Sequence, residues 1–449
     1  FCGLDRAEGV EIARRLAASG QVDFLNLIRG RIDTDAALTK VIPIQGMASA
    51  PHLDFAGEVK AATGLPMLHA ARIQDVATAR HAVASGKLDL VGMTRAHIAD
   101  PHLPRLVAAG QEARIRPCVG ATYCLDRIYE GGGALCIHNA ATGREAELPH
   151  VIPRAEVARR SVVVGAGPAG LEAARVAAER GHAVTLLEAG AQPGGQVQLI
   201  ATDPRRHEMI GIIDWRVAEL DRLGAEIRYN TFAEPEDVLA LAPEVVVIAT
   251  GGLPQLPEGA ELATTSWELL SGEVTPRGRV LVYEDGSGHA GLMAAERAAR
   301  AGAEVELVTP ERTLAPDVGG MNHVPYMRAF HELGVKVTIN TRLAAVRRQG
   351  NGYAADLTSD FAPGWGETRT VDLVVADHGT TPNADLYHAL KPASRNLGAL
   401  DYPALLRGET PFAARNPAGA FWLYRIGDAV SARNIHAGIH DALRFGLWL

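Results

Sequence analysis

Residues Ser161–Gln196, SVVVGAGPAGLEAARVAAERGHAVTLLEAGAQPGGQ, form the stretch that decides the fold of this chain. The apolar run Ser161–Val164 predicts a buried parallel strand, and the Ala-, Leu-, Glu- and Arg-rich run Leu171–Arg180 predicts a helix. A second apolar run, Val184–Leu187, ends on Glu188. Strand, loop, helix, second strand and acid in this order are typical of a dinucleotide-binding βαβ unit.

Three glycines in the loop follow the spacing G-x-G-x-x-G. Gly165 allows the tight turn, Gly167 lets a pyrophosphate approach the backbone, and Gly170 lets helix and strand pack closely. The helix N-terminus offers N–H groups to the phosphates, and Glu188 can accept the ribose hydroxyls of an adenosine. We therefore predict a dinucleotide site rather than a glycine-rich turn in an ordinary α/β domain.

Composition limits the classes of protein and partner. At 449 residues the chain is too long for one core, so several domains are expected. No apolar run approaches the roughly 20 residues of a membrane helix, and the formal net charge of −8 argues against a nucleic-acid partner. No signal peptide is visible, which favours the cytoplasm. The chain begins at Phe1 rather than Met, so we expect that a front portion is missing.

The first 110 residues alternate strand and helix in three βα units, the pattern of a parallel sheet covered by helices. The expected strands are Val22–Ile28, Leu65–Ala71 and Leu88–Met93, and the expected helices are Ala7–Ser19, Phe55–Thr63 and Val76–Ser85. The most economical interpretation is the last three units of an eight-fold βα barrel. A complete barrel needs roughly 250 residues, so more than half of it would lie upstream of Phe1.

Active groups of such barrels sit on the loops after the strands. The charged or polar candidates on these loops are Arg29, Arg31, Asp33, Asp35, Arg72, Thr94 and Arg95. Arg72 and Arg95 flank the last two strand ends, where barrels commonly hold a phosphate, and an arginine fork suits that dianion. The alternative is that these are solvated loop charges.

Three of the four cysteines cluster in a glycine-rich segment, residues 116–145. Cys118, Cys124 and Cys136 suit an iron–sulfur cluster or a metal site, although cubane ligation by cysteine alone needs four. The alternative is three buried structural cysteines. Cys2 lies on the far side of the barrel segment in sequence, and we take it as a bystander.

A second glycine motif follows the first. The linker His150–Arg160 precedes the first βαβ unit, and Val245–Gly252, with Thr250 and Gly251 at its end, predicts another strand of that region. Arg279–Asp285 then predicts a strand before a repeat of the glycine spacing at Gly286, Gly288 and Gly291, a helix at Leu292–Ala301 and a strand at Val305–Val308. The last strand leads to Thr309, with no acid in place of Glu188. This unit predicts either a nicotinamide-nucleotide domain or a vestigial one.

Near the C-terminus, the strand Phe421–Ile426 ends at Asp428, whose carboxylate can take the ribityl hydroxyls of a flavin. Several motifs together then carry a resemblance that covers essentially the whole chain: VGMTRAHIADPHLP (Val91–Pro104), RPCVG (116–120), HNAATGRE (138–145), VVVGAGPAGLEAARV (162–176), VVVIATGG (245–252) and IGDAV with ARNIH (426–436). In these the chain resembles the multidomain flavoproteins that include trimethylamine dehydrogenase and bacterial 2,4-dienoyl-CoA reductase.

The resemblance implies an α/β fold with an old-yellow-enzyme-like FMN barrel, a [4Fe–4S] segment and a pair of FAD/NAD(P)-type domains. It implies that Arg72 and Arg95 hold the FMN phosphate and that Cys118, Cys124 and Cys136 bind the cluster. For FAD it implies Gly165, Gly167, Gly170, Glu188 and Asp428, and we add Thr94, Gln196, Thr250 and Gly251 to the cofactor-binding candidates. The expected domains are 1–115 (end of the barrel), 116–150 (cluster segment and linker), 151–270 (FAD), 271–385 (NAD(P)-like) and 386–449 (return to the FAD domain).

One position departs from the family. Its second cluster cysteine corresponds to Ala121, so the cluster takes another ligand, with His138 the nearest candidate, or is a three-iron or labile cluster, or is absent. The sequence segments around the cysteines most resemble those of the dimethylglycine or N-methylproline demethylase subgroup. In that subgroup hydride transfer from an N-methyl group to FMN yields an iminium that hydrolyses to formaldehyde.

The expected function is therefore flavin-dependent demethylation of a small amine or N-methyl amino acid. Arg29 or Arg31 beside Asp33 and Asp35 would suit a zwitterionic substrate, and Ile128 and Tyr129 fall where the resemblance places part of the substrate pocket. Electrons would leave through the cluster toward FAD or an external acceptor protein, and we expect a homo-oligomer. The alternatives are an NAD(P)H-dependent enoate reductase and a non-catalytic electron-transfer module, since we expect these 449 residues alone to be inactive.

Overall fold

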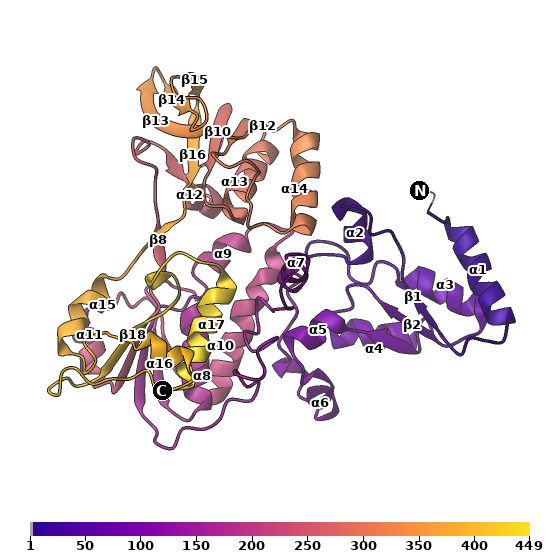
Figure 1. The fold of residues 1–449 in the computed structure, drawn as a ribbon, viewed down its shortest axis with the longest axis horizontal. Coiled ribbons are helices and arrows are strands. Elements are labelled where there is room, and N and C mark those ends of the chain that lie inside the picture. Colours follow the sequence, from indigo (N-terminus) through magenta and orange to yellow (C-terminus); the bar gives the residue numbers. More distant parts are fainter. Residues whose placement is uncertain (1–2) are drawn as a thin grey trace. The chain divides into compact units, whose positions relative to one another are not determined.

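The computed structural model describes residues 3–449 and divides the chain into two compact units (Figure 1). Unit 1 contains the residues up to Asn139 together with Gly320–Val324, and unit 2 contains Ala140–Gly319 and Pro325–Leu449. Cys2 lies outside the described residues. No helix within residues 3–449 combines the length and apolar character needed to cross a membrane.

Unit 1 contains a three-stranded parallel sheet in the order β1-β2-β3, as the alternating pattern predicts. Its elements are α1 (Arg6–Ala18), β1 (Leu25–Leu27), α2 (Asp35–Val41), α3 (Leu53–Thr63), β2 (Met67–Ala70), α4 (Val76–Ala84), β3 (Leu90–Gly92), α5 (Thr94–Ala99), α6 (Leu103–Ala108) and α7 (Tyr123–Tyr129), with a short 3-10 turn at Glu112–Arg114. The strands are shorter than predicted because only three residues of β1 and three of β3 pair with β2. A closed barrel is not formed by the described residues.

The core of unit 1 lies between its sheet and helices. Val59 and Met67 are fully buried there, packed with apolar residues of α1, α3, α4 and α5. Helix α4 begins where Asp75 accepts a hydrogen bond from the Thr78 N–H, a side-chain N-cap that fixes its start directly after the β2 loop. This cap thereby fixes the end of the loop that follows β2.

Unit 2 contains two five-stranded parallel sheets. The first has the order β18-β7-β4-β5-β6 and is formed by β4 (Arg160–Val164), β5 (Ala183–Leu187), β6 (Glu226–Arg228), β7 (Val245–Ile248) and β18 (Trp422–Arg425). Helix α8 (Pro168–Glu179) connects β4 to β5 as predicted and packs against α10 (Gly211–Leu223) and α17 (Ile435–Gly446). Strand β18 lies more than 170 residues after β7 in the sequence, yet it pairs with β7 in parallel, from Trp422↔Val245 onward.

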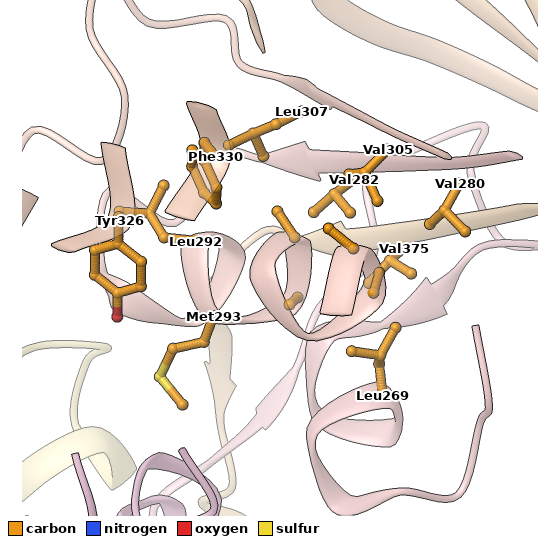
Figure 2. Packing of buried hydrophobic residues seen from close by; sticks show 14 of the residues in the cluster. Leu269, Val280, Val282, Leu292, Met293, Val305, Leu307, Tyr326, Phe330 and Val375 are labelled. Carbon is orange, nitrogen blue, oxygen red and sulfur yellow. The ribbon is translucent and has the colours of Figure 1, made fainter. Parts of the chain in front are cut away.

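The second sheet has the order β12-β11-β10-β16-β9. It is formed by β9 (Thr264–Thr265), β10 (Arg279–Glu284), β11 (Glu304–Val308), β12 (Lys336–Thr338) and β16 (Leu373–Asp377), with α13 (His289–Arg300) between β10 and β11. Figure 2 shows Leu292 of α13 beside the Tyr326 and Phe330 rings of α14 (Gly320–Leu333), and Val282 and Val305 of the sheet belong to the same buried cluster. This second βαβ unit is also as predicted.

The remaining elements of unit 2 were not expected from the sequence. An antiparallel sheet is formed by β13 (Arg342–Gln349), β14 (Gly352–Thr358) and β15 (Gly366–Val371), and β8 (Gly252–Pro254) pairs with β17 (Thr380–Pro382). The other helices are α9 (Gln196–Ile200), α11 (Pro235–Ala240), α12 (Ser266–Ser271), α15 (Asp385–Leu390) and α16 (Tyr402–Leu406), with 3-10 turns at His207–Ile210, Lys391–Ala393 and Gly427–Ala429.

Candidate cofactor sites

The first glycine loop joins β4 to α8, and at two of its glycines another part of the backbone lies too close to leave room for a side chain. Gly165 has a φ of +100°, and a Cβ on it would lie 2.4 Å from the Ala249 carbonyl oxygen. A Cβ on Gly170 would lie 1.8 Å from the Gly165 carbonyl oxygen. By contrast, nothing lies within 4 Å of a Cβ built on Gly167. Gly167 therefore faces open space at the N-terminus of α8, which fits a pyrophosphate.

Two acidic residues border this loop. The Glu188 carboxylate accepts the N–H of Ala166 at 2.6 Å and that of Gly190 at 2.7 Å, so it is fixed beside the loop. Asp428 accepts a hydrogen bond from Gln196 Nε2 at 3.0 Å, although the two residues are 232 positions apart. Burial raises the pKa of Asp428, and hydrogen bonds to it oppose that shift. The structure thus brings Gln196 and Asp428 together.

Thr250 and Gly251 lie at the corner between β7 and β8. The Thr250 hydroxyl donates to the Asn383 carbonyl oxygen, and the Asn383 N–H donates to the Gly251 carbonyl oxygen at 2.9 Å. Gly251 has a φ of +72°, a conformation that favours glycine. Both residues therefore shape the backbone next to the glycine loop.

The second glycine loop has a different electrostatic character. Gly288 also faces open space, since the nearest atom to a Cβ there would be the Gly286 carbonyl oxygen at 3.7 Å. However, the Glu284 carboxyl accepts the N–H of Ser287 at 2.8 Å, and the Asp377 carboxyl accepts that of Gly291 at 2.9 Å. Amide groups that could meet a phosphate in such a loop are thus already bonded to carboxyl groups of the chain.

Burial sets the protonation of these two acids. Burial, with the nearby Asp377 as a further cause, raises the pKa of Glu284 to about 7. Burial also raises the pKa of Asp377. Thr309, which stands where the first unit has Glu188, is fully buried and hydrogen-bonds Glu284. Thr309 is therefore part of the interior rather than a ribose ligand.

The three cysteines of the segment line one partly open pocket in unit 1. None of the three is in a disulfide. The pocket is lined by Arg95, Ile98, Cys118, Val119, Gly120, Ala121, Thr122, Tyr123, Cys124, Cys136, Ile137 and His138. The segment therefore brings the three predicted cysteines, Ala121 and His138 to one pocket.

Hydrogen-bond donors point at two of the sulfur atoms. Gln74 Nε2 donates to Cys118 Sγ at 3.0 Å, and the His138 N–H donates to Cys136 Sγ at 3.4 Å. Donors of this kind stabilise sulfur in its thiolate form. Gln74 was not among the predicted residues, because a lone glutamine in a loop carries no spacing signal.

Two of the three thiol groups, those of Cys124 and Cys136, have raised pKa values in this arrangement. Burial and the other two cysteines raise the pKa of Cys124 to about 11, and Arg95 acts in the opposite direction. Burial also raises the pKa of Cys136. No group of three or more His, Cys, Asp or Glu side chains within residues 3–449 is arranged around a single metal ion. The donor set still fits a cluster, because a cluster core is wider than one ion and binding would deprotonate the thiols.

The predicted phosphate ligands lie after β2 and β3. Arg72 is 5% exposed, has a φ of +53° and donates from Nε to the Met47 carbonyl oxygen at 2.8 Å. Thr94 and Arg95 begin α5, and Arg95 also lines the cysteine pocket. A Cβ on Gly120 would lie 2.9 Å from Arg72 Nη1, so both guanidinium groups lie beside the cysteine segment. Their charge fits an FMN phosphate.

The predicted substrate residues are exposed. Arg31 and Asp33 form an ion pair at 3.6 Å, the Arg29 guanidinium lies over the Phe55 ring, and Asp35 is the first residue of α2. Ile128 and Tyr129 are 48% and 64% exposed. All six residues are thus exposed positions of unit 1, and among them Arg31 and Asp33 are paired.

Comparison with known proteins gives a consistent family. The profile described as "Pyridine nucleotide-disulphide oxidoreductase" matches residues 159–401, more than half of the chain. The chain is 57% identical over 445 residues to the "Probable N-methylproline demethylase" of Rhizobium meliloti (strain 1021), covering 98% of this chain and 66% of the relative. It is 42% identical over 458 residues to the "N,N-dimethylglycine/sarcosine dehydrogenase" of Chromohalobacter salexigens, with 98% and 66% coverage.

A solved structure extends the likeness across the chain. The complex of 2-naphthoyl-CoA reductase with 2-naphthoyl-CoA has a TM-score of 0.84 and 27% identity, and covers 100% of this chain and 63% of that one. The resemblance predicted from the motifs is therefore confirmed. The chain spans less than two thirds of the length of each of these proteins.

Proposed function

Because the chain belongs to the pyridine nucleotide-disulphide oxidoreductase family and is 57% identical to an N-methylproline demethylase, we propose that it is part of a flavin-dependent oxidoreductase that removes an N-methyl group from a small amino acid. The identity over 98% of the chain is the observation that carries this proposal. Both curated relatives are named for N-methyl amino acids, so the proposed substrate has a carboxylate next to a methylated amine.

The proposed chemistry divides between bound groups and the chain. The N-methyl carbon would give up a hydride equivalent to a bound flavin, and water would convert the resulting iminium to formaldehyde and the demethylated amine. Arg72 and Arg95 would hold the FMN phosphate after β2 and β3, with Thr94 beside them. Cys118, Cys124 and Cys136 would hold an iron–sulfur cluster.

The first glycine loop would hold FAD. Gly167 leaves room for the pyrophosphate, and Gly165 and Gly170 allow the loop to lie close to β7 and α8. The fixed Glu188 carboxylate would accept ribose hydroxyls, and Asp428, oriented by Gln196, would accept ribityl hydroxyls. On the loop after β1, Arg29 or Arg31 would bind the substrate carboxylate, and the acidic Asp33 and Asp35 would bind the amine.

The substrate class is tested with the natural full-length protein. We expect formaldehyde to be released from N-methylproline and N,N-dimethylglycine and not from proline or glycine, which are matched controls without the N-methyl group. Release from neither methylated substrate, with flavin bound, contradicts the proposal. Replacing Arg29 and Arg31 together by glutamine should raise the apparent KM for the amino acid; an unchanged KM would remove them from the substrate site.

A second candidate function is enoate reduction with NAD(P)H, which the likeness to 2-naphthoyl-CoA reductase favours. The second glycine motif would then bind the nicotinamide nucleotide. The carboxyl groups of Glu284 and Asp377 on its loop amides argue for weak binding, because they compete with phosphate for the same N–H groups. NADPH titration decides between the two: rapid flavin reduction by micromolar NADPH favours the reductase, and its absence favours the demethylase.

A further inference from the structure

His138 lies in the cysteine pocket with a defined ring orientation. Its side chain is 1% exposed, and its Nδ1 lies 3.1 Å from the Pro117 carbonyl oxygen. A carbonyl oxygen can only accept a hydrogen bond, so Nδ1 carries the proton in this pair. In the neutral imidazole the lone pair is then on Nε2.

This orientation is the one that metal-binding histidines adopt. Such a histidine commonly donates its second ring N–H to a backbone carbonyl, which fixes the tautomer and makes the coordinating nitrogen more basic. Pro117 also immediately precedes Cys118, so the carbonyl that orients the ring belongs to the segment that presents a cysteine. His138 itself follows Cys136 by two residues, and its N–H donates to the Cys136 sulfur.

The position that lacks a sulfur lines the same pocket. Ala121 stands between Cys118 and Cys124 with two residues on either side, and it shares the pocket with all three cysteines and His138. A cluster held there by the three cysteines would need one further ligand for its fourth iron. Besides the three cysteines, two side chains in the pocket lining carry nitrogen atoms: His138 and Arg95. The Arg95 guanidinium stays protonated and does not bind metals, so the His138 imidazole is the remaining nitrogen ligand in that lining.

We propose that Nε2 of His138 is the fourth protein ligand of the cluster, beside the three thiolates of Cys118, Cys124 and Cys136. This inference rests on the cluster of the proposed function. Replacing a thiolate by a neutral imidazole removes one negative charge from the cluster, which raises its reduction potential, as histidine ligation does in Rieske centres. His138 would therefore make this cluster a better electron acceptor than one with four thiolates.

The direct test is made on the unaltered protein and needs no substitution. The natural full-length protein is purified without oxygen from cells fed ¹⁵N-histidine, and its reduced cluster is examined by pulsed electron paramagnetic resonance. We expect a directly coordinated nitrogen whose coupling changes with the isotope. A cluster with no histidine nitrogen coupling overturns the assignment of His138 and leaves the cluster standing, whereas an iron-free protein overturns the cluster of the proposed function as well.

Variants assign the nitrogen to His138. His138→Ala should lower the iron content from about four to about three per chain, and Ala121→Cys in the same protein should restore it, with loss of the nitrogen coupling and a lower reduction potential. The matched control is His69→Ala: His69 is also fully buried with Nδ1 2.9 Å from a carbonyl oxygen, that of Leu27, but it does not line the pocket. Unchanged iron and coupling in His138→Ala, or equal iron loss in His69→Ala, would contradict the proposal.

Discussion

Gly167 and Gly170 lie three residues apart in the first glycine loop and have opposite surroundings. A methyl group on Gly170 would meet the Gly165 carbonyl oxygen at 1.8 Å, and that backbone atom cannot move away without disturbing the loop. Gly170→Ala should therefore destabilise the protein by about 3 kcal/mol or more. Gly167→Ala should leave the thermal midpoint of the FAD-free protein unchanged and abolish FAD retention, because the new methyl group enters the open space.

Thermal unfolding and flavin content of both variants check this pair. A Gly167→Ala protein that keeps its FAD would contradict the placement of the pyrophosphate at the α8 N-terminus. Loss of stability in that variant without FAD would contradict the open space above Gly167.

Glu284 gives a pH prediction with a definite sign. Its pKa is raised from 4.5 to about 7 by burial, so the folded protein holds this proton more tightly than the unfolded chain does. This group should therefore lower the free energy of unfolding by about 3 kcal/mol as pH rises from 4.5 to about 7. Above that pH its contribution should be constant. Glu284→Gln should remove that part of the slope.

The measurement is the denaturant midpoint at pH 5, 6, 7 and 8 for both proteins. Only the difference between wild type and Glu284→Gln is interpreted, because Asp126, whose pKa burial raises to about 6, titrates in the same range. Parallel pH curves for the two proteins would show that Glu284 is already ionised in the folded state at pH 5.

For single residues, motif spacing was enough to predict a residue's role wherever the backbone geometry admits only one residue type. Gly165 and Gly170 were predicted because only glycine fits those approaches. Gln74 could not be predicted, since its role depends on a sulfur atom 44 residues away. Thr309 was correctly noted as a missing acid, but its burial against Glu284 depends on packing that spacing does not report.

Between elements, α8 and α10 are held together by a buried ion pair. Arg216 is fully buried and donates from Nε to Glu172 at 2.8 Å, and Arg175 donates to the same carboxylate at 2.7 Å. Glu172→Gln should lower the free energy of unfolding by about 3–5 kcal/mol, because it leaves buried guanidinium charge without its carboxylate.

The matched control is Glu226→Gln on β6. Glu226 pairs with Arg228 at 2.9 Å, but both side chains are about half exposed, at 54% and 44%. Its loss should cost about 0–1 kcal/mol. Equal shifts in thermal midpoint for the two variants would mean that the α8–α10 pair does not depend on its buried charge.

Helices and strands were predicted well where the sequence pattern that marks them is long. The bounds of β4, β10, α8 and α13 were predicted within a few residues, because apolar runs mark these elements and a glycine loop follows each strand. Strands β13–β15 were not predicted, since their residues do not alternate regularly between buried and exposed and the sequence there is rich in Ala, Arg and Thr. The return of β18 to the first sheet joins residues that local pattern cannot connect.

For the molecule as a whole, the motifs were sufficient to predict family membership, and the 57% identity to a demethylase supports the proposed chemistry. The substrate residues stay a prediction. Arg29, Arg31, Asp33 and Asp35 were chosen because they follow a strand; all four are exposed, and Arg31 and Asp33 form an ion pair. A binding pocket depends on which loops surround it, and a single loop does not encode its neighbours.

The most direct test of the central claim is a single anaerobic turnover of the natural full-length protein with bound flavin. N-methylproline is added without an electron acceptor, and flavin absorbance and formaldehyde are followed together. We predict bleaching of the flavin with one formaldehyde for each pair of electrons taken up. No bleaching with N-methylproline, followed by rapid bleaching with NADPH, would contradict demethylation and identify the protein as a reductase.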